Sequence, residues 1–408
     1  MRRILSLLIC LSFLIAEAQE SKETAYTNAY KIIDSLILKE RLTKSAIDKV
    51  DQLYKKAVIE NQEAEQIKAL VYKADLEDEI TEDGFNNSIK IFKEALKKAK
   101  SPVMQSVIHT ILAKKYNYYY TKQKWTLLNK KNGSRNAFTD TIEMHFKAAM
   151  TNANALQSVY IDQYSAVVLG GSEPLKNYSL FHLLIAEQIQ YYSNDFDNDE
   201  SKENKEKVTE LYNAIFQLYQ NEQWNNIVAR FKLDLLVWKK ENELIKEEAL
   251  LLELNNYIQP QYHSSIKAAA WFLIANTYTV KGRQYQALSD TAHQYDLVKA
   301  IGIIQQAKPQ IDSIHYVNSG LMDLANEIKQ KQIWLEIEKI NETQKPFRAY
   351  LSYKNTDTLF LKVFNVKANF NFKSETNPDQ LKELINQELV QEQAIPLLQA
   401  KDYQTHFT

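Results

Sequence analysis

The residues with the clearest chemical spacing lie in an acidic run near the middle of the chain. Asp195, Asp197, Asp199 and Glu206 occupy positions one, three, five and twelve of a calcium-binding loop, which needs oxygen ligands there. Position six of such a loop is a glycine that permits a sharp turn, and here it is Glu200. The alternative interpretation is a charged loop that leads into a helix. We therefore expect no metal ion or other cofactor, with this run as a weak candidate.

Catalytic chemistry has no comparable pattern in this sequence. The histidines are far apart along the chain, and they form neither an HExxH motif nor an i, i+4 pair. No GxSxG motif is present, and Gly170-Gly171-Ser172 lacks the lysine of a phosphate-binding loop. We expect no enzyme, and the histidines are interpreted as ordinary helix or loop residues. They are His109, His145, His182, His263, His293, His315 and His406.

One segment combines aromatic residues with lysines. Its members are Tyr116, Tyr118, Tyr119, Tyr120 and Trp125, flanked by Lys114, Lys115, Lys122 and Lys124. Such a surface could stack nucleotide bases or sugars. The alternative places Tyr116 and Tyr120 toward the core, because they are four residues apart on a helix, and leaves the others at the surface.

The elements that hold these residues are predicted to be helices. Apolar residues recur three and four apart from Ser21 to about Lys331, and only 7 glycines and 7 prolines occur in 408 residues. The predicted helices cover 46–57, 67–78, 85–99, 103–120, 138–156, 178–192, 208–220, 227–238, 244–257, 266–280, 295–307 and 311–330. So many helices of ordinary length suggest stacked pairs and not one bundle.

Some helix pairs carry degenerate tetratricopeptide (TPR) spacing, in which aromatic and small residues let paired helices approach closely. The best example has Trp271, Ile274, Ala275 and Tyr278 in a first helix, followed by Ala300, Ile304, Ala307 and Pro309. The segment 281–298 intrudes between the two helices. A non-repetitive helical domain is the alternative.

After Gln330 the apolar pattern changes to alternation, the period of a half-buried strand. Strands are predicted over 333–337, 347–353 and 359–364, with a hairpin turn at Asn355-Thr356-Asp357. A helix over 378–391 interrupts them, opened by Asn377 as the N-cap. Because a complete sandwich of seven strands takes about a hundred residues, we expect a partial, truncated β-sandwich.

The N-terminus has the order of a secretory signal peptide: Arg2 and Arg3, an apolar run, then Ala16-Glu17-Ala18. The run is too short to span a bilayer, so we expect no membrane span. Cleavage after Ala18 would also remove Cys10, the only cysteine. We expect a secreted protein of the periplasm or cell surface. A formal net charge of −1 argues against nucleic acid as a partner.

Three segments carry a family resemblance. Ile108–Tyr120 with Trp125, and Asn177–Ala186, resemble the helical N-terminal region of large alpha-2-macroglobulin-like proteins of Bacteroidetes. Phe347–Val363 resembles the opening of their first macroglobulin domain. The resemblance implies a chain of β-sandwich domains, a protease-cleavable bait segment and often a thioester formed by Cys and Gln. This sequence has no Cys-Gly-Glu-Gln, so no inhibitory residue is carried over.

Two functions remain open. The first is the leading portion of a secreted alpha-2-macroglobulin-like protein, an endopeptidase inhibitor in its full-length form, with the helices as scaffold or docking module. Its partners would be a target protease, bound through later domains, or an envelope protein. The alternative is a self-contained periplasmic helical-repeat (TPR-like) scaffold for protein binding. The expected fold is mainly α, with a signal peptide (1–18), a helical TPR-like region (19–330) and a partial macroglobulin-like β-sandwich (331–408).

Overall fold

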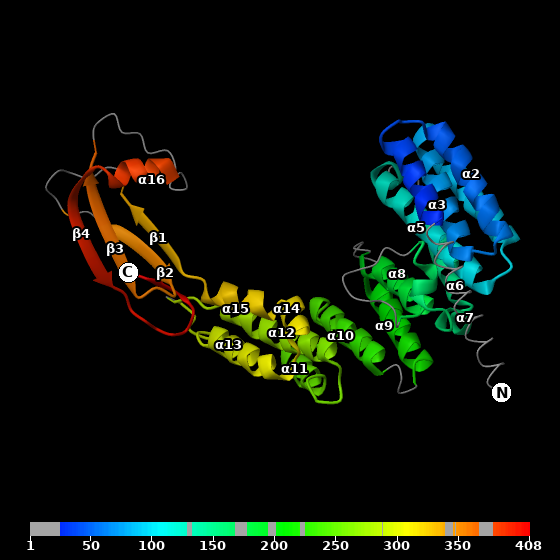
Figure 1. Cartoon of the computed structure of the whole chain (residues 1–408). Coiled ribbons are helices and arrows are strands. Elements are labelled where there is room, and N and C mark those ends of the chain that lie inside the picture. Colours follow the sequence, from blue (N-terminus) through cyan, green and yellow to red (C-terminus); the bar gives the residue numbers. More distant parts are fainter. Residues whose placement is uncertain are drawn as a thin grey trace, which may run out of the picture. The chain divides into compact units, whose positions relative to one another are not determined.

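A computed structural model describes residues 25–128, 133–167, 178–194, 201–220, 225–287, 289–338, 346, 348–366 and 378–408. The predicted signal peptide and the acidic residues 195–200 lie outside these ranges. Within them the chain is mainly helical, with small antiparallel sheets at its C-terminal end (Figure 1). None of the described helices is long and apolar enough to cross a membrane. The chain forms two compact units, Met1–Gln220 (unit 1) and Asn221–Thr408 (unit 2).

Unit 1 is built from helices. They are a helix over 25–38, α2 (Thr43–Ile59), α3 (Glu63–Ile80), α4 (Gly84–Lys98), α5 (Pro102–Leu128), α6 (Gly133–Met150), α7 (Ala153–Gln157), the 3-10 helix η1 (Ile161–Tyr164), α8 (Leu180–Asn194) and α9 (Ser201–Leu218). On α2 the spacing of three and four residues buries Ala46, Val50, Leu53 and Ala57 in one cluster with Tyr26. Each large apolar side chain buried in this way contributes about 1.5–3 kcal/mol.

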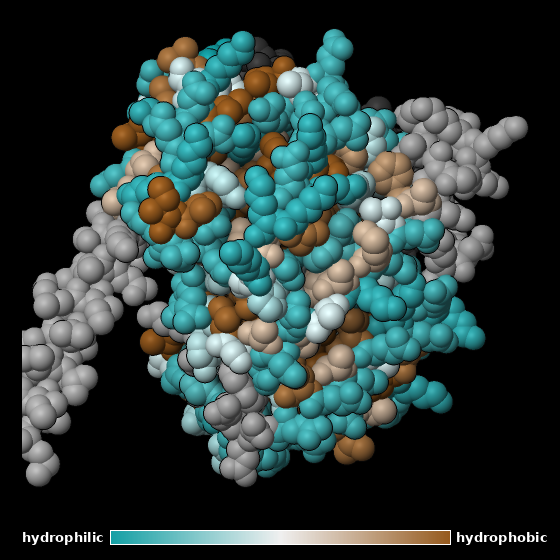
Figure 2. Space-filling model, turned by 90° about the vertical axis from the view of Figure 1, so that its right-hand side faces the viewer, coloured by the Kyte–Doolittle hydropathy of each residue, from teal (hydrophilic) through white to brown (hydrophobic). Residues whose placement is uncertain are grey.

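The surface of unit 1 on the side of α2 is mostly hydrophilic (Figure 2). Hydrophobic residues appear there in small patches between long hydrophilic side chains. Two of the exposed apolar residues, Val58 and Ile59, lie at the C-terminal end of α2.

Unit 2 begins with helices. These are α10 (Asn225–Glu241), α11 (Glu247–Asn256), α12 (Ser264–Gly282), α13 (Asp296–Ala307), the 3-10 helix η4 (Lys308–Gln310), α14 (Ser313–Asn318) and α15 (Leu321–Lys329). The residues with TPR spacing do meet: Trp271 and Ala275 of α12 share a buried cluster with Ala300, Ile304 and Ala307 of α13. The prediction of one helix over 311–330 is wrong, because the helix is interrupted at Gly320, which has a left-handed φ of 80°.

The C-terminal part of unit 2 contains two small sheets. In the first, β2 (Ala349–Lys354) pairs antiparallel with β1 (Gln332–Ile337) and with β5 (Thr405–Phe407), in the order β1-β2-β5. In the second, β3 (Thr358–Asn365) pairs antiparallel with β4 (Glu388–Pro396). The predicted alternation is confirmed on β2, where Leu351 and Tyr353 are buried and Tyr350 is exposed.

Two predictions for this part are corrected by the structure. The residues Asn355–Asp357 do not form a hairpin turn, because β2 and β3 belong to different sheets. Asn355, at a φ of 55°, turns the chain between them, and its amide donates to the carbonyl oxygens of Ile328 (2.8 Å) and Gln330 (3.0 Å) at the end of α15. The helix expected over 378–391 ends at Ile385 (α16, Pro378–Ile385), and Leu389 lies in β4, opposite Phe364.

Candidate functional site

Most of the calcium-loop candidate lies outside the described residues. Asp195, Asp197 and Asp199 lie outside them, and Glu206 lies on α9. Among the residues that the structure describes, no group of three or more His, Cys, Asp or Glu side chains could hold a metal ion.

Two histidines that are distant in sequence meet in unit 1. His109 on α5 and His145 on α6 place their Nδ1 atoms 2.8 Å apart, so one ring donates to the other. Burial, together with the nearby His109 and Lys93, lowers the pKa of His145 to about 4, and burial lowers the pKa of His109. Both rings are therefore neutral at pH 7. No sequence motif indicated this pair, because the two residues are 36 positions apart and lie on different helices.

A serine and a histidine that belong to no sequence motif also come together. His182 Nδ1 accepts from the backbone N–H of Ser179 (3.0 Å) and lies 2.9 Å from the Ser179 hydroxyl. The Tyr219 hydroxyl is 2.6 Å from the same serine oxygen. Burial lowers the pKa of His182 to about 4. All three side chains are buried, so a substrate does not reach the hydroxyl, and the cluster ties α8 to the end of α9.

The aromatic segment of α5 packs more extensively than either interpretation predicted. Phe85 of α4 stacks on Tyr119, with ring centroids 3.9 Å apart, and meets Tyr116 edge-on. Phe138 of α6 contacts Tyr116, Tyr119 and Tyr120. Tyr118 alone among the four tyrosines is exposed. These rings therefore join three helices, and three of the four tyrosines are not available as a stacking surface.

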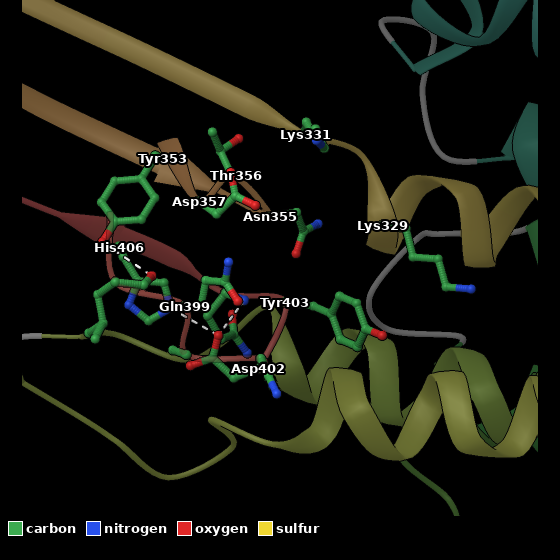
Figure 3. Close-up of a pocket in the computed structure, with 14 residues that line it drawn as sticks. Lys329, Lys331, Tyr353, Asn355, Thr356, Asp357, Gln399, Asp402, Tyr403 and His406 are labelled. Atoms are coloured by element: carbon green, nitrogen blue, oxygen red, sulfur yellow. Dashed lines mark hydrogen bonds and ion pairs between the residues drawn. The ribbon is translucent and has the colours of Figure 1, made fainter. Parts of the chain in front are cut away.

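A cavity of about 420 Å³ in unit 2 lies where the helices meet the sheets (Figure 3). It is bounded by the end of α15, the connection from β2 to β3, and the loop that leads from β4 to β5. Lys329, Lys331 and Lys401 lie around it together with the exposed carboxylate of Asp357. None of these three lysines has an ion pair among the described residues. Three lysines therefore face two carboxylates, those of Asp357 and of the buried Asp402, which leaves one excess positive charge.

The wall of this cavity is held by three residues near the C-terminus, Asp402, Gln404 and His406, which we call the C-terminal anchor. The buried Asp402 carboxylate accepts from Gln294 Nε2 (2.9 Å), from the Gln404 backbone N–H (3.0 Å) and from His406 Nε2 (2.9 Å). Figure 3 shows His406 and Asp402 pointing toward each other, with Tyr403 directed toward the helices. Burial alone would raise the pKa of Asp402, but these hydrogen bonds lower it.

Gln404 completes the anchor on the helical side. Its buried side-chain amide donates to the carbonyl oxygens of Gly282 (2.9 Å) and Gln294 (3.2 Å), in the connection between α12 and α13. The anchor therefore fastens β5 to the α12–α13 hairpin. Its hydrogen bonds hold this wall of the cavity in place.

The sheets expose apolar side chains on both faces. On one face Trp334 (67% exposed), Tyr350 and Phe407 lie on three adjacent strands, and the rings of Tyr350 and Phe407 stack at 5.7 Å. On the opposite face of β1, Ile333, Leu335 and Ile337 are exposed as well. Phe360 of β3 is 70% exposed. The sheets thus combine exposed apolar side chains on both faces with few buried ones.

Comparisons of this chain with models of protein families, with curated proteins and with solved structures gave no match.

Proposed function

We propose that this chain is the leading portion of a secreted alpha-2-macroglobulin-like protein whose role is binding. In this proposal the two sheets of unit 2 are the first strands of a macroglobulin-type β-sandwich. The helices form a TPR-like scaffold or docking module, and protease inhibition would belong to the full-length protein. The support is of two kinds: the sequence resemblance of Phe347–Val363, and sheets whose apolar faces and edges are open.

The main structural support for the proposal is the exposed apolar surface of the sheets. All six residues of β1 are exposed, and in β4 Ile395 is the only residue that is even partly buried. A sandwich buries one face of each sheet against the other, with inward residues alternating along each strand. Here Leu351 and Tyr353 of β2 are buried, but their neighbours on β1 are not. Further β-structure that covers β1 would remove this apolar surface from water.

The edge of β1 supports the same proposal. Leu351 exchanges two backbone hydrogen bonds with Thr408, both 3.0 Å long, so Tyr350 and Ser352 direct their backbone groups toward β1. The backbone N–H and C=O groups of Ile333, Leu335 and Ile337 then point away from β2. Natural proteins protect such an edge with lysine, proline or a covering segment, whereas β1 contains a single charged residue, Glu336. Strand addition at this edge would satisfy its free groups.

A second candidate is a self-contained helical-repeat scaffold. The observation in its favour is the close packing of α12 on α13 through Ala275 and Ala300, both fully buried, with Trp271 beside them. In this candidate the sheets are an appendage to the helices.

The coding sequence downstream of the Thr408 codon separates the two candidates. The first predicts an in-frame continuation that encodes further alternating strands, and the longer product should form a complex with an added endopeptidase after cleavage. A stop codon directly after Thr408, together with a stably folded product, would contradict the first candidate and favour the second.

A further inference from the structure

We propose that a groove across α2, α3, α4 and the start of α5 in unit 1 is a docking site for an acidic peptide segment of a partner protein that also carries apolar side chains. The groove combines two hollows of about 680 and 140 Å³. Both are lined by Tyr54, Ala95 and Lys98, so the two hollows are adjacent. The inference concerns unit 1 and does not depend on the function proposed for the sheets of unit 2.

The length of the groove suits an extended peptide. It follows α2 from Asp51 to Ile59 and α4 from Ile91 to Lys98. With a rise of 1.5 Å per helical residue, the lined stretch of α2 is about 12 Å long. An extended chain rises about 3.3 Å per residue, so the groove accommodates roughly four peptide residues.

The apolar lining of the groove includes side chains that project into solvent at its rim. Ile59 is 80% exposed and Val58 is 44% exposed, although both are large aliphatic residues, and Ala99 and Met104 line the same hollow. Exposed aliphatic residues beside a concave surface are the usual contacts for apolar side chains of a bound segment.

The charges around the groove determine which peptide it fits. Lys55, Lys98 and Lys100 line the larger hollow, and none of them has an ion pair among the described residues. The one acidic residue of that hollow, Glu63, accepts a hydrogen bond from the Tyr164 hydroxyl (2.9 Å) and keeps its negative charge, so three lysines face one carboxylate there.

In the smaller hollow the charges are more balanced. Asp51 is paired with Lys73 at 2.7 Å, and Glu94 is the remaining carboxylate. With each residue counted once, four lysines of the groove face three carboxylates, and the excess positive charge lies in the larger hollow. A partner that supplies carboxylates there gains electrostatic complementarity, which sets specificity and association rate.

The test measures binding of fluorescein-labelled short peptides to the whole chain by fluorescence anisotropy. The probe alternates leucine and glutamate, and its controls replace glutamate by lysine or leucine by serine. We expect saturable binding of the leucine–glutamate peptide alone, weakened by added salt because exposed charges are screened. Absence of saturable binding, or equal binding of the lysine peptide, would overturn the proposal.

Variants then locate the site. The Lys98→Glu/Lys100→Glu variant should weaken binding about tenfold, because like charges oppose the peptide. The Ile59→Ser variant should weaken binding because it removes an apolar contact at the rim, and it should not unfold the protein because Ile59 is exposed. Lys97→Glu is the matched control, since Lys97 neighbours Lys98 on α4, is exposed and does not line the groove. Equal weakening by Lys97→Glu would place the peptide elsewhere and refute the assignment.

Discussion

Replacement of Asp402 by alanine should release β5 from the helices. The buried carboxylate accepts three hydrogen bonds, from Gln294, His406 and the backbone of Gln404. Removing one partner from a buried, hydrogen-bonded charged group costs about 3–5 kcal/mol, because the remaining donors stay buried without an acceptor. Since 1.4 kcal/mol corresponds to a factor of ten, the opening equilibrium of this segment should rise by at least about a hundredfold.

Hydrogen exchange followed by mass spectrometry or NMR measures this opening directly. The informative amides are those of Leu351 and Thr408, which bond to each other's carbonyl oxygens across β2 and β5. Asp357→Ala is the matched control, because Asp357 borders the same cavity with an exposed carboxylate, and surface changes of this kind stay within about 0.5 kcal/mol. If Asp402→Ala exchanges no faster than Asp357→Ala, the anchor does not hold β5 and the reasoning is refuted.

Three further predictions concern the helices and the exposed aromatic face. The fold depresses the pKa of His145 and of His182 from 6.5 to about 4, so the stability that each neutral ring supports is present above pH 6.5 and is lost as pH falls toward 4. The free energy of unfolding of unit 1, measured with urea, should fall over this range by up to about 3 kcal/mol per histidine. The His182→Gln variant should show a smaller fall of this free energy with pH. In unit 2, Gly302→Ala should stabilise α13 by about 0.5–1 kcal/mol, since a Cβ there meets nothing within 4 Å. Gly282→Ala should instead destabilise the protein by about 1–3 kcal/mol, because its Cβ would lie 2.7 Å from Leu297 Cγ. Thermal unfolding measures both variants, and a shift of the melting temperature in the same direction for both would contradict the packing described here. Finally, Trp334→Ser should leave the melting temperature nearly unchanged and reduce binding of a hydrophobic dye, because Trp334 is mostly exposed; a large loss of stability would mean that the face is already covered.

The helical part of the fold was largely predictable because its cause is local. The spacing of Ala46, Val50, Leu53 and Ala57 identifies a buried helix face without knowledge of any other element. The interruption of the helix at Gly320 was not predicted, because a single glycine within a helical apolar pattern does not by itself indicate a left-handed turn.

Strand pairing was the least predictable part, because it depends on residues far away in the sequence. Alternation identified β2 correctly, but it does not reveal that β2 pairs with β1 and β5 and not with β3. The C-terminal anchor could not be predicted for the same reason, because Gln294 and Asp402 are 108 residues apart and neither belongs to a motif. The division into two units between Gln220 and Asn221 was also not predictable from the apolar pattern.

Hydrogen exchange along β1 tests the central proposal, that further β-structure covers the open sheet. It should be measured on this chain and on the product purified from its natural source. In this chain the outward amides of Ile333, Leu335 and Ile337 should exchange rapidly, whereas those of Trp334 and Glu336, which face β2, should be slower. The proposal predicts that the outward amides become protected in the natural product. Equally rapid exchange in both would show that β1 is a permanent free edge and would contradict it.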